Sequence, residues 1–232
     1  MGSLSERIRE EEVMDSPDLD VRLHHQALAA LRRVNLWSGI GSRLAGTLAD
    51  VAKQRELRRL RVLDLASGGG DVSRSMRRRG VAVELHGWDR SETAVDYAAA
   101  QAKRQGMTGA KFAVHDVLAD PIEETFDAVV CTLFLHHLEY SEAIRLLQKM
   151  RAAAKQAVLV DDLLRTRTGF WLARAGTRLL TLSPVVHTNG PMSVRAAFSL
   201  DEIHQLADRA ELAGATICTH WPSRFLLCWQ RP

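Results

Sequence analysis

Residues 61–72, RVLDLASGGGDV, decide the fold of this chain. Val62, Leu63 and Leu65 belong to an apolar run that is typical of a buried strand, and Asp71 follows the glycines where a helix would begin. Glycine adopts positive φ and lets the backbone approach a ligand closely, while the free N–H groups of a helix start favour an anionic group. The stretch therefore predicts a strand, a ligand-binding turn and a helix, with Asp64 just before the turn.

Length and composition indicate a single α/β domain. The chain has 232 residues, of which 46% are hydrophobic and 25% charged, as is typical of a soluble globular protein. We expect no membrane span, because no run of about eighteen apolar residues occurs. The first residues lack the apolar core of a signal peptide, which predicts a cytoplasmic protein. The net charge of +3 favours solvated helix faces over a nucleic-acid interface.

Two helices are predicted before the glycine-rich stretch. Residues 1–17 are polar without apolar periodicity, and we expect them to form a mobile tail. Asp18 or Asp20 is the expected cap of the first helix, and Ile40, Leu44, Leu48 and Val51 give the second helix an apolar stripe. Residues 1–57 are thus interpreted as a tail and a helical cap over the turn. Side chains that could reach a ligand there are His24, His25, Arg32, Asn35 and Trp37.

Strand and helix patterns alternate after the turn. We expect helices at 71–79, 91–105, 141–155 and 200–212, and strands at 81–89, 111–116, 126–135 and 157–162. Such an order predicts a parallel sheet with right-handed crossovers, and two closing strands joined by Pro222 and Ser223 predict an antiparallel hairpin. Ligands of an open parallel sheet bind beyond the carboxyl ends of its strands. The polar residues expected at those ends are Asp64, Asp89, Asp116, Thr132 and Asp161 or Asp162.

Residues 163–198 interrupt this alternation. The first part is helical with an apolar side, and the part from Ser183 to Phe198 is predicted to be a loop, because Pro184, Gly190 and Pro191 punctuate it. An insertion of this size beside the ligand-binding edge favours a substrate lid. Its apolar side chains suit a hydrophobic acceptor.

Three segments resemble the class I S-adenosylmethionine-dependent methyltransferases of the small-molecule type, which include the ubiquinone and menaquinone methyltransferases. They are VLDLASGGGD (62–71), LHGWDRSETAVDYA (85–98) and FDAVVCTLFLHHL (126–138). The resemblance implies an α/β Rossmann-like methyltransferase fold for residues 58–232. Its sheet would be mostly parallel and seven-stranded, with an antiparallel C-terminal hairpin and an N-terminal helical addition.

The same resemblance implies a cofactor site for S-adenosyl-L-methionine. Asp64 would lie near the amino group of the cofactor, Asp89 would accept hydrogen bonds from both ribose hydroxyls, and Asp116 would meet the adenine amino group. One ionised carboxylate can accept from two hydroxyls together, which supports the role of Asp89 independently. The remaining positions expected to contact the cofactor are Ala66, Ser67, Gly68, Gly70, Arg90, Val117, Thr132 and Leu133. The family usually has glycine where Ala66 stands.

A dinucleotide-binding oxidoreductase is the alternative, because Asp89 also follows the turn by about twenty residues as that fold requires. The third small residue of its glycine motif would be Ser73. In addition, neither tyrosine has a lysine four positions later, as a short-chain dehydrogenase would. These departures favour the methyltransferase.

The methyl acceptor is interpreted as a small aromatic hydroxyl compound, such as a phenol, a phenolic polyketide or a quinol. His136 aligns with the general base of plant phenolic O-methyltransferases, although related enzymes use a similar histidine structurally. His187 and Asp161 are the next candidates for the base. Carbon methylation of a quinone precursor stays open. We expect no metal ion, and a homodimer is one option for the oligomeric state.

Overall fold

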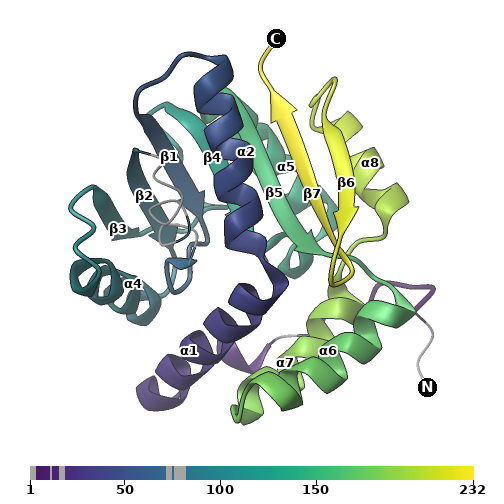
Figure 1. Cartoon of the computed structure of the whole chain (residues 1–232). Helices are drawn as coiled ribbons and strands as arrows, with labels where there is room; N and C mark the ends of the chain where they lie inside the picture. The colour runs from purple at the N-terminus through teal and green to yellow at the C-terminus, as the bar shows by residue number, and fades with distance from the viewer. Residues whose placement is uncertain (1–3, 11, 16–18, 72–74, 76–81) are drawn as a thin grey trace.

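The computed structural model describes residues 4–10, 12–15, 19–71, 75 and 82–232. A seven-stranded sheet in the order β3-β2-β1-β4-β5-β7-β6 forms its centre (Figure 1). Strands β1 to β5 pair in parallel, whereas β7 runs antiparallel to both β5 and β6. The predicted fold class and the closing hairpin are therefore confirmed. The strands are β1 (Leu60–Leu65), β2 (Val83–Asp89), β3 (Ala110–Val114), β4 (Phe126–Thr132), β5 (Ala154–Leu163), β6 (Thr216–His220) and β7 (Arg224–Gln230).

Helices cover both faces of the sheet and one of its ends. α2 lies across one face, α5 and α8 lie behind the other, and α1, α6 and α7 gather at the end toward which the parallel strands point (Figure 1). Their bounds are α1 (Val21–Ser38), α2 (Ile40–Gln54), α4 (Glu92–Arg104), α5 (Tyr140–Ala153), α6 (Arg167–Leu180), α7 (Pro184–Ala196) and α8 (Leu200–Arg209). Two short 3-10 turns are η1 (Val13–Asp15) and η2 (Leu135–His137).

Successive side chains of β1 point to opposite faces of the sheet and contribute to the core on both faces. Val62 packs with Leu44 and Leu48 of α2, while Leu63 and Leu65 point to the opposite face. All five side chains are buried. Burying such a side chain contributes about 1.5–3 kcal/mol. The contiguous apolar run of β1 is thus explained by helices on both of its faces.

The predicted caps are largely confirmed. Asp20 accepts hydrogen bonds from the N–H groups of Arg22 and Leu23 at the start of α1, and Ser91 accepts from Ala94 at the start of α4. Asp18 lies outside the described residues. So does most of the helix predicted at 71–79, of which Asp71 and Ser75 are described and helical.

The loop predicted at 183–198 is wrong, because α7 occupies most of it. Pro184 stands in the first turn, where its missing N–H costs nothing, and Pro191 is tolerated inside the helix. Val185 and Val186 of α7 are buried with side chains of α1, and Val194 is buried as well. This tertiary packing outweighs the helix-breaking tendency of the proline.

The mobile tail predicted at 1–17 is also wrong for its described residues. The Arg7 side chain donates to the carbonyl oxygen of His136 at 2.7 Å, and the backbone N–H of Ile8 donates to the carbonyl oxygen of Arg195 at 3.1 Å. Glu12 accepts a hydrogen bond from Asn189 of α7 at 2.9 Å. Hydrogen bonds of Arg7, Ile8 and Glu12 thus join this segment to η2 and α7.

Candidate active site

The turn after β1 requires unusual backbone angles. Ala66, Gly68 and Gly70 have φ of +53°, +49° and +73°. A Cβ on Gly70 would come within 3.2 Å of the Phe112 ring, whereas a Cβ on Gly68 would meet nothing within 4 Å. A side chain at Gly70 would therefore crowd the Phe112 ring, whereas Gly68 leaves open space beside the backbone where a ligand can approach.

Asp64 is a fully buried carboxylate at the end of β1, and neither of its oxygens has a hydrogen-bond partner among the described residues. Burial raises the pKa of Asp64 well above its usual value, and the nearby charges of Asp89 and Asp71 raise the pKa further. The buried hydroxyl of Ser67 likewise lacks a partner in the described part of the chain. Unpartnered buried groups of this kind are costly, so a ligand with donors or positive charge fits here.

Asp89 stands at the end of β2 and braces the glycine turn. Its Oδ2 accepts a hydrogen bond from the N–H of Gly68 at 2.8 Å, and its Oδ1 accepts from the N–H of Ser91 at 2.9 Å. A carboxylate oxygen has two lone pairs, so each retains capacity for one more donor. The position fits the predicted role toward a ribose, and the neighbouring Arg90 is exposed.

Asp116 and Val117 follow β3. Oδ1 of Asp116 accepts from the N–H groups of Leu118 and Ala119 at 2.8 and 3.2 Å, which closes a local turn. The side chain of Val117 is buried in the core rather than exposed at the edge. The predicted contacts of both residues with adenine stay predictions.

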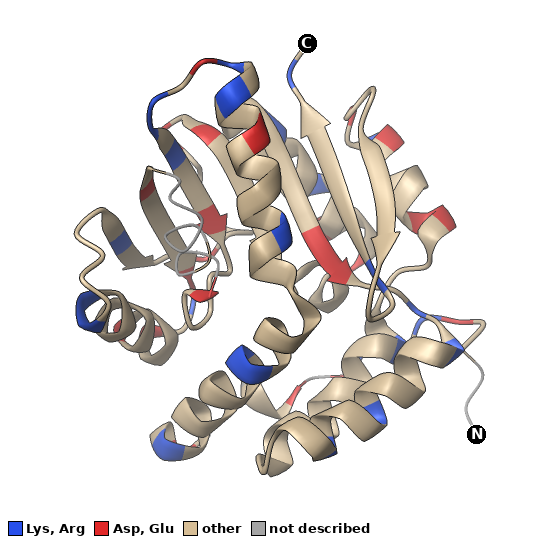
Figure 2. Cartoon of the chain, viewed as in Figure 1, with Lys and Arg blue, Asp and Glu red and all other residues tan. Residues whose placement is uncertain are grey.

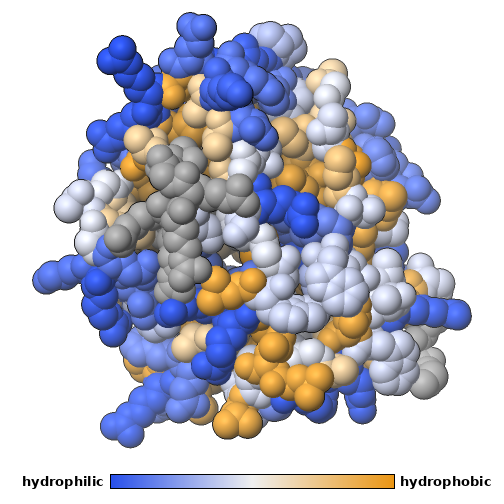
Figure 3. All heavy atoms as spheres, viewed as in Figure 1, coloured by the Kyte–Doolittle hydropathy of each residue, from blue (hydrophilic) through white to orange (hydrophobic). Residues whose placement is uncertain are grey.

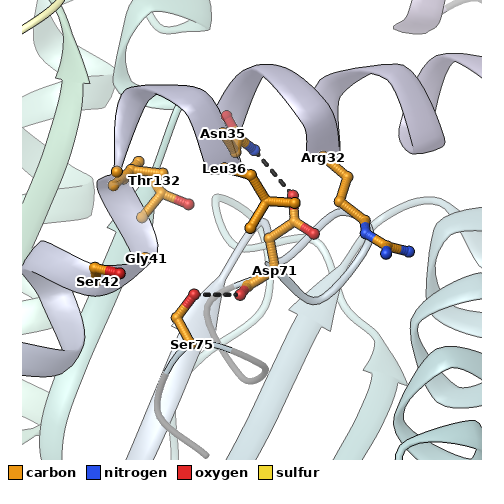
Figure 4. A pocket seen from close by; sticks show the side chains of 10 residues that line it. Arg32, Asn35, Leu36, Gly41, Ser42, Asp71, Ser75 and Thr132 are labelled. Atoms are coloured by element: carbon orange, nitrogen blue, oxygen red, sulfur yellow. Dashed lines mark hydrogen bonds between the residues drawn. The ribbon is translucent and has the colours of Figure 1, made fainter. Parts of the chain in front are cut away.

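A small pocket opens between the α1–α2 junction and the glycine turn. It has a volume of about 40 Å³, and Figure 4 shows Arg32, Asn35, Asp71 and Thr132 around it. Asn35 donates from Nδ2 to Oδ2 of Asp71 at 3.0 Å and so ties α1 to the turn. About 10–15 Å³ of such volume holds one water molecule, so the pocket has room for about three water molecules and not for a whole adenosyl ligand. Arg32 and Asn35 of α1 line this pocket, and their predicted contact with a ligand stays a prediction.

The chain turns sharply after Thr132, so the strand predicted to reach residue 135 is wrong at its end. Leu133 has a φ of +53°, and its N–H donates to the carbonyl oxygen of Asp161 at 3.0 Å. The 3-10 turn η2 follows and places His136 beside the end of β5. The strand ends because the backbone turns at Leu133. The apolar residues 133–135 look like a continuation of the strand, so the sequence pattern does not predict this end.

His136 is buried between two carboxylates. Its Nδ1 lies 2.7 Å from Oδ1 of Asp162, and its Nε2 lies 3.6 Å from Oε1 of Glu12. Burial alone would lower the pKa of His136, but the charges and hydrogen bonds of Asp162 and Glu12 raise the pKa to about 10. Burial raises the pKa values of Glu12 and Asp162, but the contacts with His136 and with neighbouring donors outweigh it, so both pKa values are lower than usual. We name this set the Glu12–His136–Asp162 network.

Glu12 is a site residue that the sequence reasoning missed. It lies in the polar segment 1–17 that is predicted to be a mobile tail, yet it is linked to Asn189 and to the hydroxyl of Ser193. With His136 and His137 it brings three potential metal-ligand atoms within 4.8 Å of one another. A metal ion there would have to displace the proton of His136.

The other two candidates for the base are engaged elsewhere. Asp161 accepts from Arg224 Nε at 2.8 Å and lies 2.9 Å from Nε2 of His220. His187 lies in α7, with its Nε2 2.9 Å from the carbonyl oxygen of Thr181. The structure therefore brings His136 and Asp162 together and places Asp161 in a separate ion-paired cluster.

Comparisons with known proteins agree with this geometry. Residues 62–157 match the family model described as a methyltransferase domain. A comparison with curated proteins found no significant match. Among solved structures, human N-acetylserotonin methyltransferase in complex with SAM superposes with a TM-score of 0.64 at 18% identity, covering 90% of this chain and 55% of that one.

Two further solved structures are similar. An O-methyltransferase family 2 protein of Planctomyces limnophilus in complex with apigenin has a TM-score of 0.55 at 17% identity and covers 75% of this chain and 50% of that chain. The magnesium protoporphyrin IX methyltransferase of Synechocystis with bound SAM has a TM-score of 0.60 at 15% identity and covers 94% of this chain and 100% of that chain. The chain thus spans about half the length of the human and Planctomyces proteins.

The matched domain, the sheet order and the glycine turn define the class of protein. Residues 62–157 match a methyltransferase domain, and the fold around them is the Rossmann-like fold of the class I S-adenosylmethionine-dependent methyltransferases, which implies S-adenosylmethionine as the cofactor. The residues present fit that cofactor, since Asp64 offers an unpartnered carboxylate to a cationic ligand and Gly68 leaves open space beside the turn. The bound cofactor supplies an electrophilic methyl group on a sulfonium. No helix among the described residues is long and apolar enough to cross a membrane.

Proposed function

We propose that this chain transfers the methyl group of S-adenosylmethionine to a hydroxyl of a small, hydrophobic aromatic acceptor, such as a phenol, a phenolic polyketide or a quinol. The observation that carries the proposal is the Glu12–His136–Asp162 network at the ends of β4 and β5. It lies at the same edge of the sheet as the glycine turn, where an acceptor would have to present its nucleophile.

An oxygen nucleophile needs a proton acceptor, because a neutral phenol is weakly nucleophilic near pH 7. The network has two carboxylates for one imidazolium and thus a net charge of −1. The acceptor hydroxyl becomes strongly acidic as its oxygen bonds to the methyl carbon and the bond from that carbon to sulfur breaks, so a carboxylate of the network can take up the proton even though its pKa is lowered. The base in the proposed reaction is therefore the network rather than the single imidazole of His136.

Apolar side chains near this edge favour an aromatic acceptor. Phe134 stacks on the ring of His137 beside the network, with ring centroids 5.9 Å apart. Aromatic rings lining a site hold planar, apolar ligands by stacking and burial. The apigenin complex of the Planctomyces O-methyltransferase supports the same acceptor class by analogy of fold.

The test is methyl transfer from isotopically labelled S-adenosylmethionine to a panel of phenols, polyketides and quinols, with products analysed by mass spectrometry. We expect the label on an oxygen atom. Label on a ring carbon would instead assign the chain to carbon methylation of a quinone precursor. Cofactor binding without transfer to any acceptor would contradict the proposed reaction but not the cofactor assignment.

A further inference from the structure

The solvent-facing side of α6 is a continuous stripe of arginine and apolar residues. The exposed residues of this stripe are separated by three, four and one positions along the helix: Trp171, Arg174, Arg178 and Leu179. Leu182 follows just beyond the helix and is also exposed. Trp171 is 52% exposed, Leu179 85% and Leu182 91%. Residues at such spacings share one face of a helix. Large apolar side chains are not normally left this exposed together, so the face is suited to bind a partner.

The three helices at this end carry charge of a single sign. Helices α1, α6 and α7 contain seven arginines and neither Asp nor Glu. Figure 2 shows blue and tan but no red along α6. Within the described part of the chain, Arg174 and Arg178 have no carboxylate partner. The face therefore combines exposed apolar groups with uncompensated positive charge.

The apolar surface continues from the start of α6 onto the β6–β7 turn. Thr166, the cap of α6, donates a hydrogen bond to Ser223 at 3.1 Å, next to Trp221. Trp221 is exposed and contacts Trp37 at the end of α1. Figure 3 shows hydrophobic atoms gathered over the region of α6 and α7 on the viewed side. We name the set Trp171, Arg174, Arg178, Leu179, Leu182 and Trp221 the α6 surface.

We propose that the α6 surface docks this protein on an anionic lipid bilayer, with α6 lying in the plane of the interface. Helices that bind in this way place Trp and Leu in the headgroup boundary and Arg near the lipid phosphates. Trp171 and Trp221 supply the aromatic groups that prefer this boundary, and Arg174 and Arg178 supply the positive charge.

Charge favours a bilayer over a second copy of the chain. A two-fold dimer through this face would bring arginines of both copies together, since α6 offers no acidic residue to pair with them. An anionic bilayer complements both features, because it accepts the apolar groups and attracts the arginines.

The experiment is co-sedimentation of the full chain with vesicles of phosphatidylcholine, with and without phosphatidylglycerol. We expect binding that requires phosphatidylglycerol and weakens with added salt, because the attraction is screened. R174E/R178E should lower the vesicle partition coefficient at least about tenfold, since four units of charge change at the surface. L179Q/L182Q should also lower it, because the apolar insertion is lost.

The matched control is R104E/R145E, which makes the same charge change on α4 and α5 and should leave binding within about twofold of wild type. All six substituted positions are exposed, and circular dichroism checks the fold of each variant. Equal binding to both kinds of vesicle, or full binding by R174E/R178E, would overturn the proposal. A dimer in sedimentation velocity that L179Q/L182Q abolishes would overturn it in favour of a second copy. None of these readouts depends on methyl transfer, so this proposal and the proposed function fail separately.

Discussion

Asp162 holds His136 at two points, since its Oδ1 lies 2.7 Å from the ring Nδ1 and its Oδ2 accepts from the backbone N–H at 3.0 Å. The first contact orients the ring and directs Nε2 toward Glu12 of the N-terminal segment. A residue more than a hundred positions away in the chain thereby gives the network at the end of β4 its net negative charge.

Glu12→Gln should impair methyl transfer without weakening cofactor binding. The substitution leaves one carboxylate for one imidazolium, so the network loses the negative charge with which it would take up a proton. We expect kcat to fall at least about tenfold, as when a general base is removed. The pKa of His136 should fall as well, which NMR titration can follow. The control is Glu10→Gln, because Glu10 is half-exposed and lies 3.8 Å from Arg195. An equal loss in both variants would contradict the role of the network.

The stability of the protein should fall as the pH rises from about 6.5 to about 10. The folded pKa of His136 is about 10, which is above the unfolded value of about 6.5. The stabilisation from its charged form is therefore complete below the unfolded pKa and is lost through the folded one. Urea unfolding across this range should show the decline in wild type and not in His136→Gln. His115→Gln, altered at a half-exposed histidine, should keep the wild-type slope.

Asp64→Asn should stabilise the cofactor-free protein and weaken cofactor binding. Folding raises the pKa of Asp64, so ionising this buried group costs stability at every pH above its unfolded pKa. The neutral amide removes that cost and also removes the negative charge offered to the cofactor. We expect a higher Tm together with a Kd for S-adenosylmethionine at least about tenfold larger by calorimetry. Asp96→Asn on the exposed side of α4 should change neither, and unaltered affinity in Asp64→Asn would separate Asp64 from the cofactor.

The sequence predicted the sheet well because its strands are contiguous apolar runs that end at polar residues. Val158 to Asp162 follows this rule, and Asp89 stands at a strand end as expected. The helix α7 could not be predicted in this way. Its Pro191 is a helix-breaking signal, and only the packing of Val185 and Val186 against α1 outweighs it.

The catalytic side of the site could be predicted only in part. His136 is conspicuous after its strand, but its charge state depends on Glu12, and nothing local in an acidic run distinguishes a buried glutamate from a solvated one. Asp161 and Asp162 are adjacent in sequence, yet alternation along β5 sends them to different partners, Arg224 and His136. Sequence order alone does not say which carboxylate belongs to the site.

Ala66→Gly should stabilise the protein slightly. Ala66 has a φ of +53°, which costs an L-residue about 1–2 kcal/mol, while glycine adopts this conformation freely. The added entropy of glycine in the unfolded chain offsets about 0.4–1 kcal/mol of that gain. A net increase of roughly 0.5–1 kcal/mol in the free energy of unfolding is expected from urea titrations. Ala113→Gly in β3 lacks the positive φ and should lose about 0.5–1 kcal/mol. Destabilisation by both changes would show that the turn is not strained at Ala66.

Asp161→Asn should reduce stability rather than turnover. Asp161 is fully buried and neutralises Arg224, which is itself buried, so the amide leaves an uncompensated charge in the core. Breaking such a pair costs about 3–5 kcal/mol. We expect a large fall in Tm, with the turnover of the folded fraction near that of wild type. The double variant D161N/R224M should recover much of the stability, because it removes the stranded charge, and Asp208→Asn on the exposed side of α8 should have little effect. Wild-type stability with lost turnover in Asp161→Asn would instead assign this carboxylate to the chemical step.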